Sequence, residues 1–270
     1  MRMRSMVLAC VLCLLPGCGS EGSDDSDGDA PEHDVDPPGE PASDALSDEF
    51  DDASTRSRWR LWQEVVGEDP RHELLDIDQT NPGMLTIRPR AGGWYAEHEG
   101  PLLYKLVEGD FLVETRVTAS KIGNPDAPPD QPYNSAGLLV RDPNHAPGRD
   151  NWVMYNVGRQ DGRVASEGKT TVDSQSVLEL VEGARQGRLR ICRLGSQLVL
   201  ARQLEGEAAF TVTQRYDRSD LPATLQVGAI VNGWNSLGPE PDLGVAPDLE
   251  ASFDYVRLSR PTTEADCMAP

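Results

Sequence analysis

Short runs of alternating apolar and polar residues recur from about residue 83 to residue 259. Within 109–120, the odd positions from Phe111 to Val117 are mostly apolar, whereas the even positions from Asp110 to Arg116 are mostly polar. Successive side chains of a β-strand point to opposite faces, so a period of two predicts half-buried strands. Helical periodicity is nearly absent along the same stretch.

Clusters of Gly, Pro, Asn and Asp separate these runs and predict turns between strands. Three longer interruptions, at 121–135, 142–151 and 235–248, are rich in Pro and Gly and predict loops. Many short strands without intervening helices favour antiparallel sheets packed face to face. The sequence therefore predicts an all-β domain, a two-sheet antiparallel sandwich, and its loops are the places where binding is expected.

The order of several short blocks resembles a known family. GDFLVETRV, SAGLLVRDP, NWVMYNVG, LRICRLG and SFDYVRL follow one another as in the concanavalin A-like domain at the C-terminus of many β-xylosidases. The resemblance covers about residues 49–260 and implies a jelly-roll sandwich of the concanavalin A-like lectin and glucanase type. It implies little about chemistry, and a role in supporting a catalytic propeller domain is not carried over, because the sequence contains none.

The first residues predict export. Two arginines precede an apolar run at 6–15, which is too short for a permanent membrane-spanning helix, so 1–17 is expected to be a signal peptide. Leu-Pro-Gly-Cys at 15–18 resembles the lipobox of bacterial lipoproteins, which implies lipidation at Cys18 and a membrane anchor through the attached acyl chains. Gly19 after this cysteine resembles lipoproteins sorted to the outer membrane, so we expect a cell-envelope location, at the outer membrane or cell surface.

Composition separates a tether from the domain. Residues 18–47 hold many carboxylates and no Lys or Arg, which predicts a disordered acidic linker, followed by the domain at 48–260 and a C-terminal tail at 261–270. The net charge of −20 argues against a nucleic-acid partner. Cys192 and Cys267 are the cysteines left after processing, and export permits a disulfide between them, although the sequence does not show whether they meet.

Aromatic residues beside turn residues suggest a carbohydrate site. Sugar rings stack on Trp and Tyr, while amide groups bind the hydroxyls. Trp94 and Tyr95 follow a Gly pair, and Trp234 lies between Asn232 and Asn235 at the start of a predicted loop. We therefore expect these five residues to form a glycan-binding surface. Aromatic residues of β-sandwiches are more often core residues, and that alternative stays open.

Catalytic carboxylates are harder to find. Glu108, Asp110 and Glu114 come nearest to the laminarinase-type motif, but on one strand the outer two would start roughly 20 Å apart, too far to act as a pair. The sequence favours a solvent-exposed strand face for them. A glycosidase whose carboxylates come from separate strands remains an alternative, as does a structural or protein-interaction domain without a sugar site.

A structural calcium ion is the one cofactor that the sequence suggests. Asp48 and Asp51 open the domain and Asp254 lies in its last strand, and the first and last strands of jelly rolls commonly lie together. Carboxylates and backbone carbonyls are the oxygen ligands that Ca²⁺ takes. Surface carboxylates that bind nothing are the alternative.

Overall fold

The computed structural model describes residues 45–144, 146–183, 185–238 and 244–269. The expected signal peptide, Cys18 and nearly all of the expected tether lie outside these residues. Over the ranges that it describes, the structure contains no helix with the length and apolar character needed to cross a membrane.

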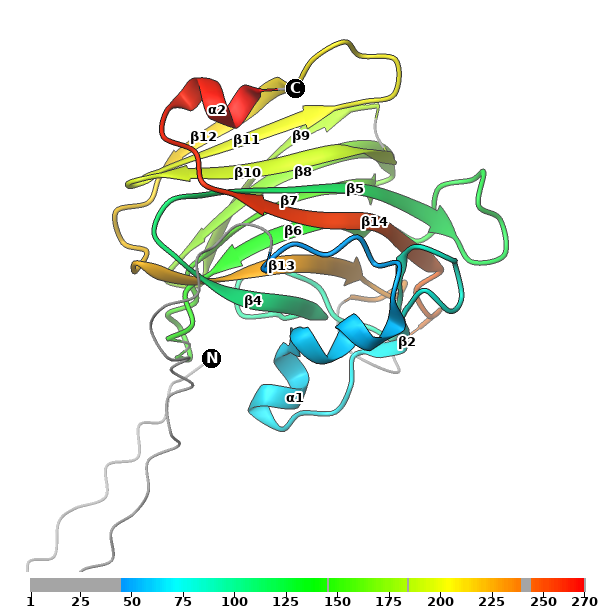
Figure 1. Ribbon diagram of the computed structural model, residues 1–270. Helices are drawn as coiled ribbons and strands as arrows, with labels where there is room; N and C mark the ends of the chain where they lie inside the picture. The colour runs from blue at the N-terminus through cyan, green and yellow to red at the C-terminus, as the bar shows by residue number, and fades with distance from the viewer. Residues whose placement is uncertain (1–44, 145, 184, 239–243, 270) are drawn as a thin grey trace, which may run out of the picture. The chain divides into compact units, whose positions relative to one another are not determined.

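Two antiparallel sheets form the domain, as the alternation predicted (Figure 1). Sheet A has the order β12 (Thr211–Asp217), β11 (Gln197–Gln203), β10 (Gln186–Leu194), β5 (Phe111–Lys121), β14 (Leu249–Ser259), β3 (Leu85–Pro89) and β2 (His72–Ile77). Sheet B has the order β1 (Arg60–Leu61), β4 (Leu102–Glu108), β13 (Thr224–Gly233), β6 (Asn134–Arg141), β7 (Trp152–Gln160), β8 (Arg163–Val172) and β9 (Gln175–Glu182). Sequential strands often change sheet, which is the arrangement of a jelly roll.

Three short helical segments accompany the sheets: η1 (Ala53–Arg58), α1 (Trp62–Val66) and α2 (Glu264–Met268). Asp52 caps η1 by accepting a hydrogen bond from the amide of Ser54. Thr263 and Asp266 form a capping box at the start of α2. Each segment is too short to be stable alone, so packing against a sheet must hold it in place.

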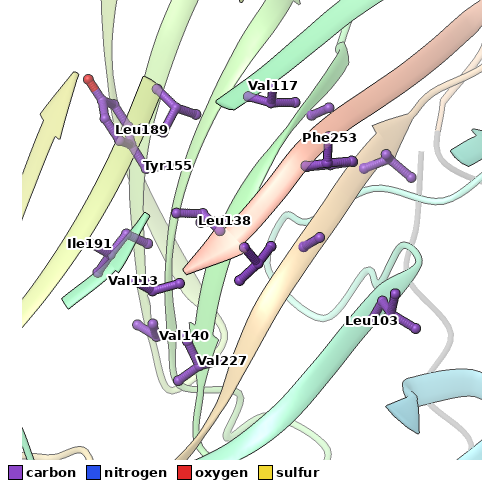
Figure 2. Close-up of a cluster of buried hydrophobic side chains, with 14 of the residues drawn as sticks. Leu103, Val113, Val117, Leu138, Val140, Tyr155, Leu189, Ile191, Val227 and Phe253 are labelled. Carbon is purple, nitrogen blue, oxygen red and sulfur yellow. The ribbon is translucent and has the colours of Figure 1, made fainter. Parts of the chain in front are cut away.

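The main core lies between the sheets. The odd residues of β5 face this interior, where Phe111, Val113 and Val117 are fully buried. Figure 2 shows side chains of both sheets gathered in the same cluster. Its labelled members are Leu103, Val113, Val117, Leu138, Val140, Tyr155, Leu189, Ile191, Val227 and Phe253. Burial of such apolar surface, at about 25 cal/mol per Å², is the main stabilising contribution.

Sheet B is also apolar on its outer face, away from sheet A. A second cluster there contains Trp62, Trp94 and Trp152, and the rings of Trp94 and Trp152 meet edge to face at 6.0 Å. Trp152 and Tyr155 have opposite parity in β7, and both are buried, one in each cluster. The second cluster shows that a segment outside the sheet covers part of this face.

Both ends of the domain are fixed to sheet A. Asp48 pairs with Val256 of β14, which confirms that the first segment lies beside the last strand. Figure 1 shows β14, in red, running alongside β5. At the C-terminus, a disulfide joins Cys192 of β10 to Cys267 of α2, with 5.8 Å between their Cα atoms. The exported location expected from the sequence permits this bond.

Replacement of Cys192 and Cys267 by serine together should lower the free energy of unfolding by about 2–4 kcal/mol, because the disulfide closes a 75-residue loop in the unfolded chain. Urea denaturation of the oxidised protein and the double variant measures this difference. The reduced wild-type protein is the control, and it should match the variant. Equal midpoints for the oxidised protein and the variant would contradict the prediction.

Candidate functional site

The segment between β3 and β4, residues 90–101, lies across the outer face of sheet B, and we call it the Trp94 loop. Its start pairs with the end of β13 through Gly92 and Gly233. The amide of Ala96 donates to the Ser176 hydroxyl of β9 at 2.8 Å. Since β13 and β9 are separated by three strands of the sheet, the loop crosses most of this face.

Trp94 anchors this loop, and its predicted exposure is wrong, because its side chain is fully buried. Its amide donates to the Asn232 Oδ1 atom at 2.6 Å, and its carbonyl oxygen accepts from the Lys169 Nζ atom at 2.8 Å. The Gly pair before it does not leave the indole in solvent, since the apolar face of sheet B offers it a larger gain on burial. Trp94 therefore cannot stack on a sugar.

Tyr95, Tyr133 and Trp234 come together beside the Trp94 loop and form the aromatic cluster. The Trp234 ring lies 4.7 Å from the Tyr133 ring and 6.5 Å from the Tyr95 ring, measured between centroids. Tyr95 is 41% exposed, and the other two are partly exposed. The cluster thus presents aromatic surface from three segments that are far apart in the sequence.

Gly93 makes this arrangement sterically feasible. A Cβ atom at this position would lie 1.8 Å from the Trp234 Nε1 atom, so only glycine fits beneath the indole. Burial and then the Asp161 carboxylate raise the pKa of Tyr133, and its hydroxyl donates to Asp161 at 3.3 Å. The hydroxyl is therefore protonated at neutral pH.

The two predicted amide ligands have structural roles instead. Asn232 is buried, and besides accepting from Trp94 it donates to the Ser135 hydroxyl at 3.2 Å. Asn235 accepts from the amides of Leu237 and Gly238 at 2.8 and 2.9 Å, which stabilises the turn after Trp234. The prediction that these two side chains line a sugar site is wrong, because both are turned into the protein.

A buried polar group lies next to the aromatic cluster on the outer face of sheet B. Lys169 of β8 is within 5.6 Å of the Tyr95 ring centroid and forms an ion pair with Glu167 at 3.0 Å. Glu167 also accepts from the Asn156 Nδ2 atom of β7 at 3.2 Å, and Gln160 donates to the Asn156 Oδ1 atom at 2.9 Å. All four side chains are buried. The ion pair is therefore a supporting layer under the aromatic surface.

A second buried ion cluster holds the far end of the Trp94 loop. Arg141 of β6 pairs with Glu99 of the loop and with Asp150, the latter at 3.0 Å. Its guanidinium lies 4.1 Å from the Trp62 ring centroid, a cation–π contact. Glu99 and Asp150 are thus ion-paired with Arg141, just as Glu167 is ion-paired with Lys169.

The residues expected for calcium do not form a ligand set in the structure. Asp48 accepts from the amide of Phe50 and the indole of Trp59, at 3.0 and 2.8 Å. Throughout the part of the chain that the structure describes, no group of three or more His, Cys, Asp or Glu residues is arranged to hold a metal ion. Calcium binding by Asp48, Asp51 and Asp254 thus remains a prediction from the sequence.

The motif-like carboxylates do not share a strand. Glu108 ends β4 in sheet B, Asp110 lies in the following turn, and Glu114 belongs to β5 in sheet A. The expectation of one strand is wrong, because the Gly109 turn carries the chain from one sheet to the other. Glu108 and Glu114 still do not form a catalytic pair, because they lie in different sheets.

Sequence reasoning missed Tyr133, Glu167 and Lys169 as neighbours of the site. Tyr133 stands in a loop already expected to be functional, and its aromatic side chain among Pro and Asn residues was the available signal. Glu167 and Lys169 lie in an alternating run, where charged residues predict an exposed face. Only the crossing of the Trp94 loop over β8 makes them buried.

Comparison with known proteins shows a shared fold. The chain is similar to a functionally unknown protein from Saccharomyces cerevisiae, with a TM-score of 0.56 and 16% identity, covering 77% of this chain and 99% of that one. It is similar to a GH43B protein of the Bacteroides ovatus xyloglucan PUL, with a TM-score of 0.58 and 13% identity, covering 80% and 39% of the two chains. No family model and no curated protein matches the sequence.

A xylan β-1,4-xylosidase from Bacillus halodurans C-125 is also similar, with a TM-score of 0.56 and 18% identity, covering 86% of this chain and 41% of the enzyme. The chain thus spans about 40% of the length of these two larger proteins. The likeness confirms the fold that the resemblance implied, a concanavalin A-like β-sandwich. At these identities it carries no activity to this chain.

Replacement of Glu167 by glutamine should lower the free energy of unfolding by about 3 kcal/mol, because Lys169 would remain buried without a counter-charge. Chemical denaturation measures this loss. Glu182→Gln is the matched control on β9, since its partner Arg163 is 51% exposed, and its effect should be under about 1 kcal/mol. A similar loss for both variants would show that the buried pair has no special role.

Proposed function

We propose that the protein is an exported lipoprotein, anchored through Cys18, whose sandwich binds carbohydrate without turning it over. The observation that carries the carbohydrate-binding part of this proposal is the aromatic cluster. Tyr95, Tyr133 and Trp234 gather at one place from three separate segments, and their rings are held there by contacts with one another. Partly exposed aromatic rings of this kind offer apolar faces for the C–H surface of a sugar.

The surroundings of the cluster support binding of a polar ligand. The Tyr133 hydroxyl donates its proton to Asp161, so the hydroxyl oxygen and the Asp161 carboxylate are left as acceptors for sugar hydroxyl groups at the edge of the cluster. The Glu167–Lys169 pair beneath is fixed by Asn156 and by the backbone of Trp94. A rigid base reduces the entropy that side chains would lose when a sugar binds.

Binding without turnover is supported by the state of the carboxylates on this face. Retaining glycosidases need two carboxyl groups about 5–5.5 Å apart, and inverting enzymes need them within about 10 Å. Glu167 is paired with Lys169, and Glu99 and Asp150 are both paired with Arg141. These three carboxylates are therefore engaged in ion pairs with little solvent exposure and are not presented to a ligand on the aromatic surface.

Tyr95→Ala and Trp234→Ala should each weaken the retention of the full-length protein on polysaccharide affinity gels by at least about tenfold, through loss of stacking surface. A panel of plant and bacterial polysaccharides provides the gels. Val177→Ala is the control, since Val177 is 65% exposed on β9, outside the cluster, and its retention should not change.

Two outcomes would count against this function. If no polysaccharide in the panel retards the wild-type protein, the binding proposal fails. If the protein releases reducing sugar from a glycan that it binds, the absence of turnover is wrong, and the glycosidase alternative replaces it.

The anchor is tested separately. Cys18→Ala should move the protein from the membrane fraction to the soluble envelope fraction and abolish incorporation of labelled palmitate, because the cysteine thiol is the attachment point. Ser20→Ala, two residues after the expected attachment point, is the control and should remain in the membrane fraction. Membrane association of the Cys18→Ala protein would overturn the lipoprotein assignment.

A further inference from the structure

The three rings of the aromatic cluster do not form a flat platform. The Trp234 ring is inclined by 51° to the Tyr133 ring and by 85° to the Tyr95 ring. Parallel rings would offer one level surface to the faces of consecutive sugar units. A group in the angle between two inclined rings instead contacts both of them. An ammonium group is suited to this position, because it is attracted to the face of each aromatic ring.

The backbone holds Tyr133 against Trp234 at a conformational cost. Tyr133 has a φ of 54°, in the left-handed region that side chains other than glycine rarely adopt. The buried Asn134 side chain donates to the carbonyl oxygens of Pro132 and Trp234 at 3.0 and 2.7 Å. The Trp234 amide in turn donates to the Tyr133 carbonyl oxygen at 3.4 Å. The two rings are therefore in place before a ligand arrives, which favours binding.

The edge of the cluster carries a negative charge. Asp161 is exposed in the turn between β7 and β8, and its carboxylate accepts from the Tyr133 hydroxyl at 3.3 Å. Among the residues that the structure describes, no cation lies within ion-pair distance of this carboxylate. The carboxylate and the Tyr133 oxygen atom together present acceptors to a ligand.

Two of the cations near the cluster already have carboxylate partners. Lys169, beneath Tyr95, is buried and pairs with Glu167 at 3.0 Å. Arg163, in the strand that follows the turn, pairs with Glu182 at 3.4 Å. Neither pair adds a net charge to the surface of the cluster.

Arg159 and Lys121 belong to a separate charge group beside the same turn. Arg159 donates to two backbone carbonyl oxygens. Lys121 pairs with Asp130, and Asp248 accepts from the amide of Asp130 at 2.8 Å. The pKa of Asp130 is lowered by Lys121 first and also by Arg159. Two cations thus face two carboxylates, and Asp161 adds one negative charge on this side.

We propose that the aromatic cluster is selective for glycans with free amino groups, of the deacetylated glucosamine type. This inference rests on the carbohydrate binding proposed above and names the class of glycan. The protonated amine lies in the angle between the rings, with the Asp161 carboxylate as its counter-charge. A uronic acid would instead bring a second negative charge to an edge that offers acceptors.

Isothermal titration of the full-length protein tests this selectivity at about pH 6, where a primary amine is protonated and an Asp carboxylate is ionised. The ligands are the β-1,4-linked tetramers of glucosamine, N-acetylglucosamine and glucose, which differ in the group at C2. We expect the glucosamine tetramer to bind at least about tenfold more tightly than the other two, because only its C2 group is a cation.

Asp161→Asn should reduce this preference by about threefold, as expected for an exposed ion pair, and leave the affinity for the glucose tetramer unchanged. Asp217→Asn is the matched control, since Asp217 is an exposed aspartate on β12 of the other sheet, and it should keep the full preference. Trp234→Ala should weaken binding of all three tetramers, because the stacking surface is lost.

A chain with a net charge of −20 also attracts cations without a specific site, and tetralysine measures that effect. Tetralysine binding as tight as that of the glucosamine tetramer, or an equal loss of preference in Asp161→Asn and Asp217→Asn, would overturn the proposal.

The remaining outcomes separate this selectivity from the function on which it rests. Equal affinity for the three tetramers would overturn the selectivity and leave carbohydrate binding intact. Absence of binding by all three tetramers would overturn the selectivity, and the polysaccharide gels then decide whether carbohydrate binding fails with it.

Discussion

Burial of alternate strand residues between the two sheets holds this domain together. Leu, Val, Ile and Phe side chains from the central strands of both sheets fill one interior, and each sheet covers the apolar face of the other. This stacking fixes the register of every strand, since a shift by one residue would turn the buried set toward solvent. The residues of opposite parity in each strand then form the two outer faces of the sandwich.

The outer face of sheet B is covered by a loop, whereas that of sheet A stays partly open, because the residues on the two faces differ. The outer face of sheet B is largely apolar around Trp152 and Tyr104, and the Trp94 loop covers it with a further indole. Charged groups that fall under the loop become buried, and each finds a partner, as Glu167 and Arg141 do. The outer face of sheet A carries charged residues from β5, β10 and β14, and it is left partly open between the two end segments of the domain.

This division bears on function. In the xylosidase and the GH43B protein the same fold accompanies a longer chain, whereas here the sandwich makes up most of the described residues. The partly exposed aromatic rings beside sheet B are the surface on which the proposed carbohydrate binding rests.

The alternation along the chain was enough to predict the fold class and the main core, whereas Glu114, expected on a solvent-exposed strand face, is buried. The odd residues of β5 are buried as their parity predicted, because the direction of a strand side chain depends only on local backbone geometry. Trp59 and Trp62 are also buried. The three Pro- and Gly-rich interruptions are connections between strands, as predicted.

Contacts between segments far apart in the chain determine which aromatic residues reach the surface. Trp94 and Tyr95 are neighbours after the same Gly pair, yet one is buried against Trp152 and the other is 41% exposed. Asn232 and Asn235 turned inward for the same reason, since the loop and the turn that they stabilise require their hydrogen bonds. The path of a loop across a sheet depends on contacts between residues far apart in the chain, and a local pattern contains no information about them.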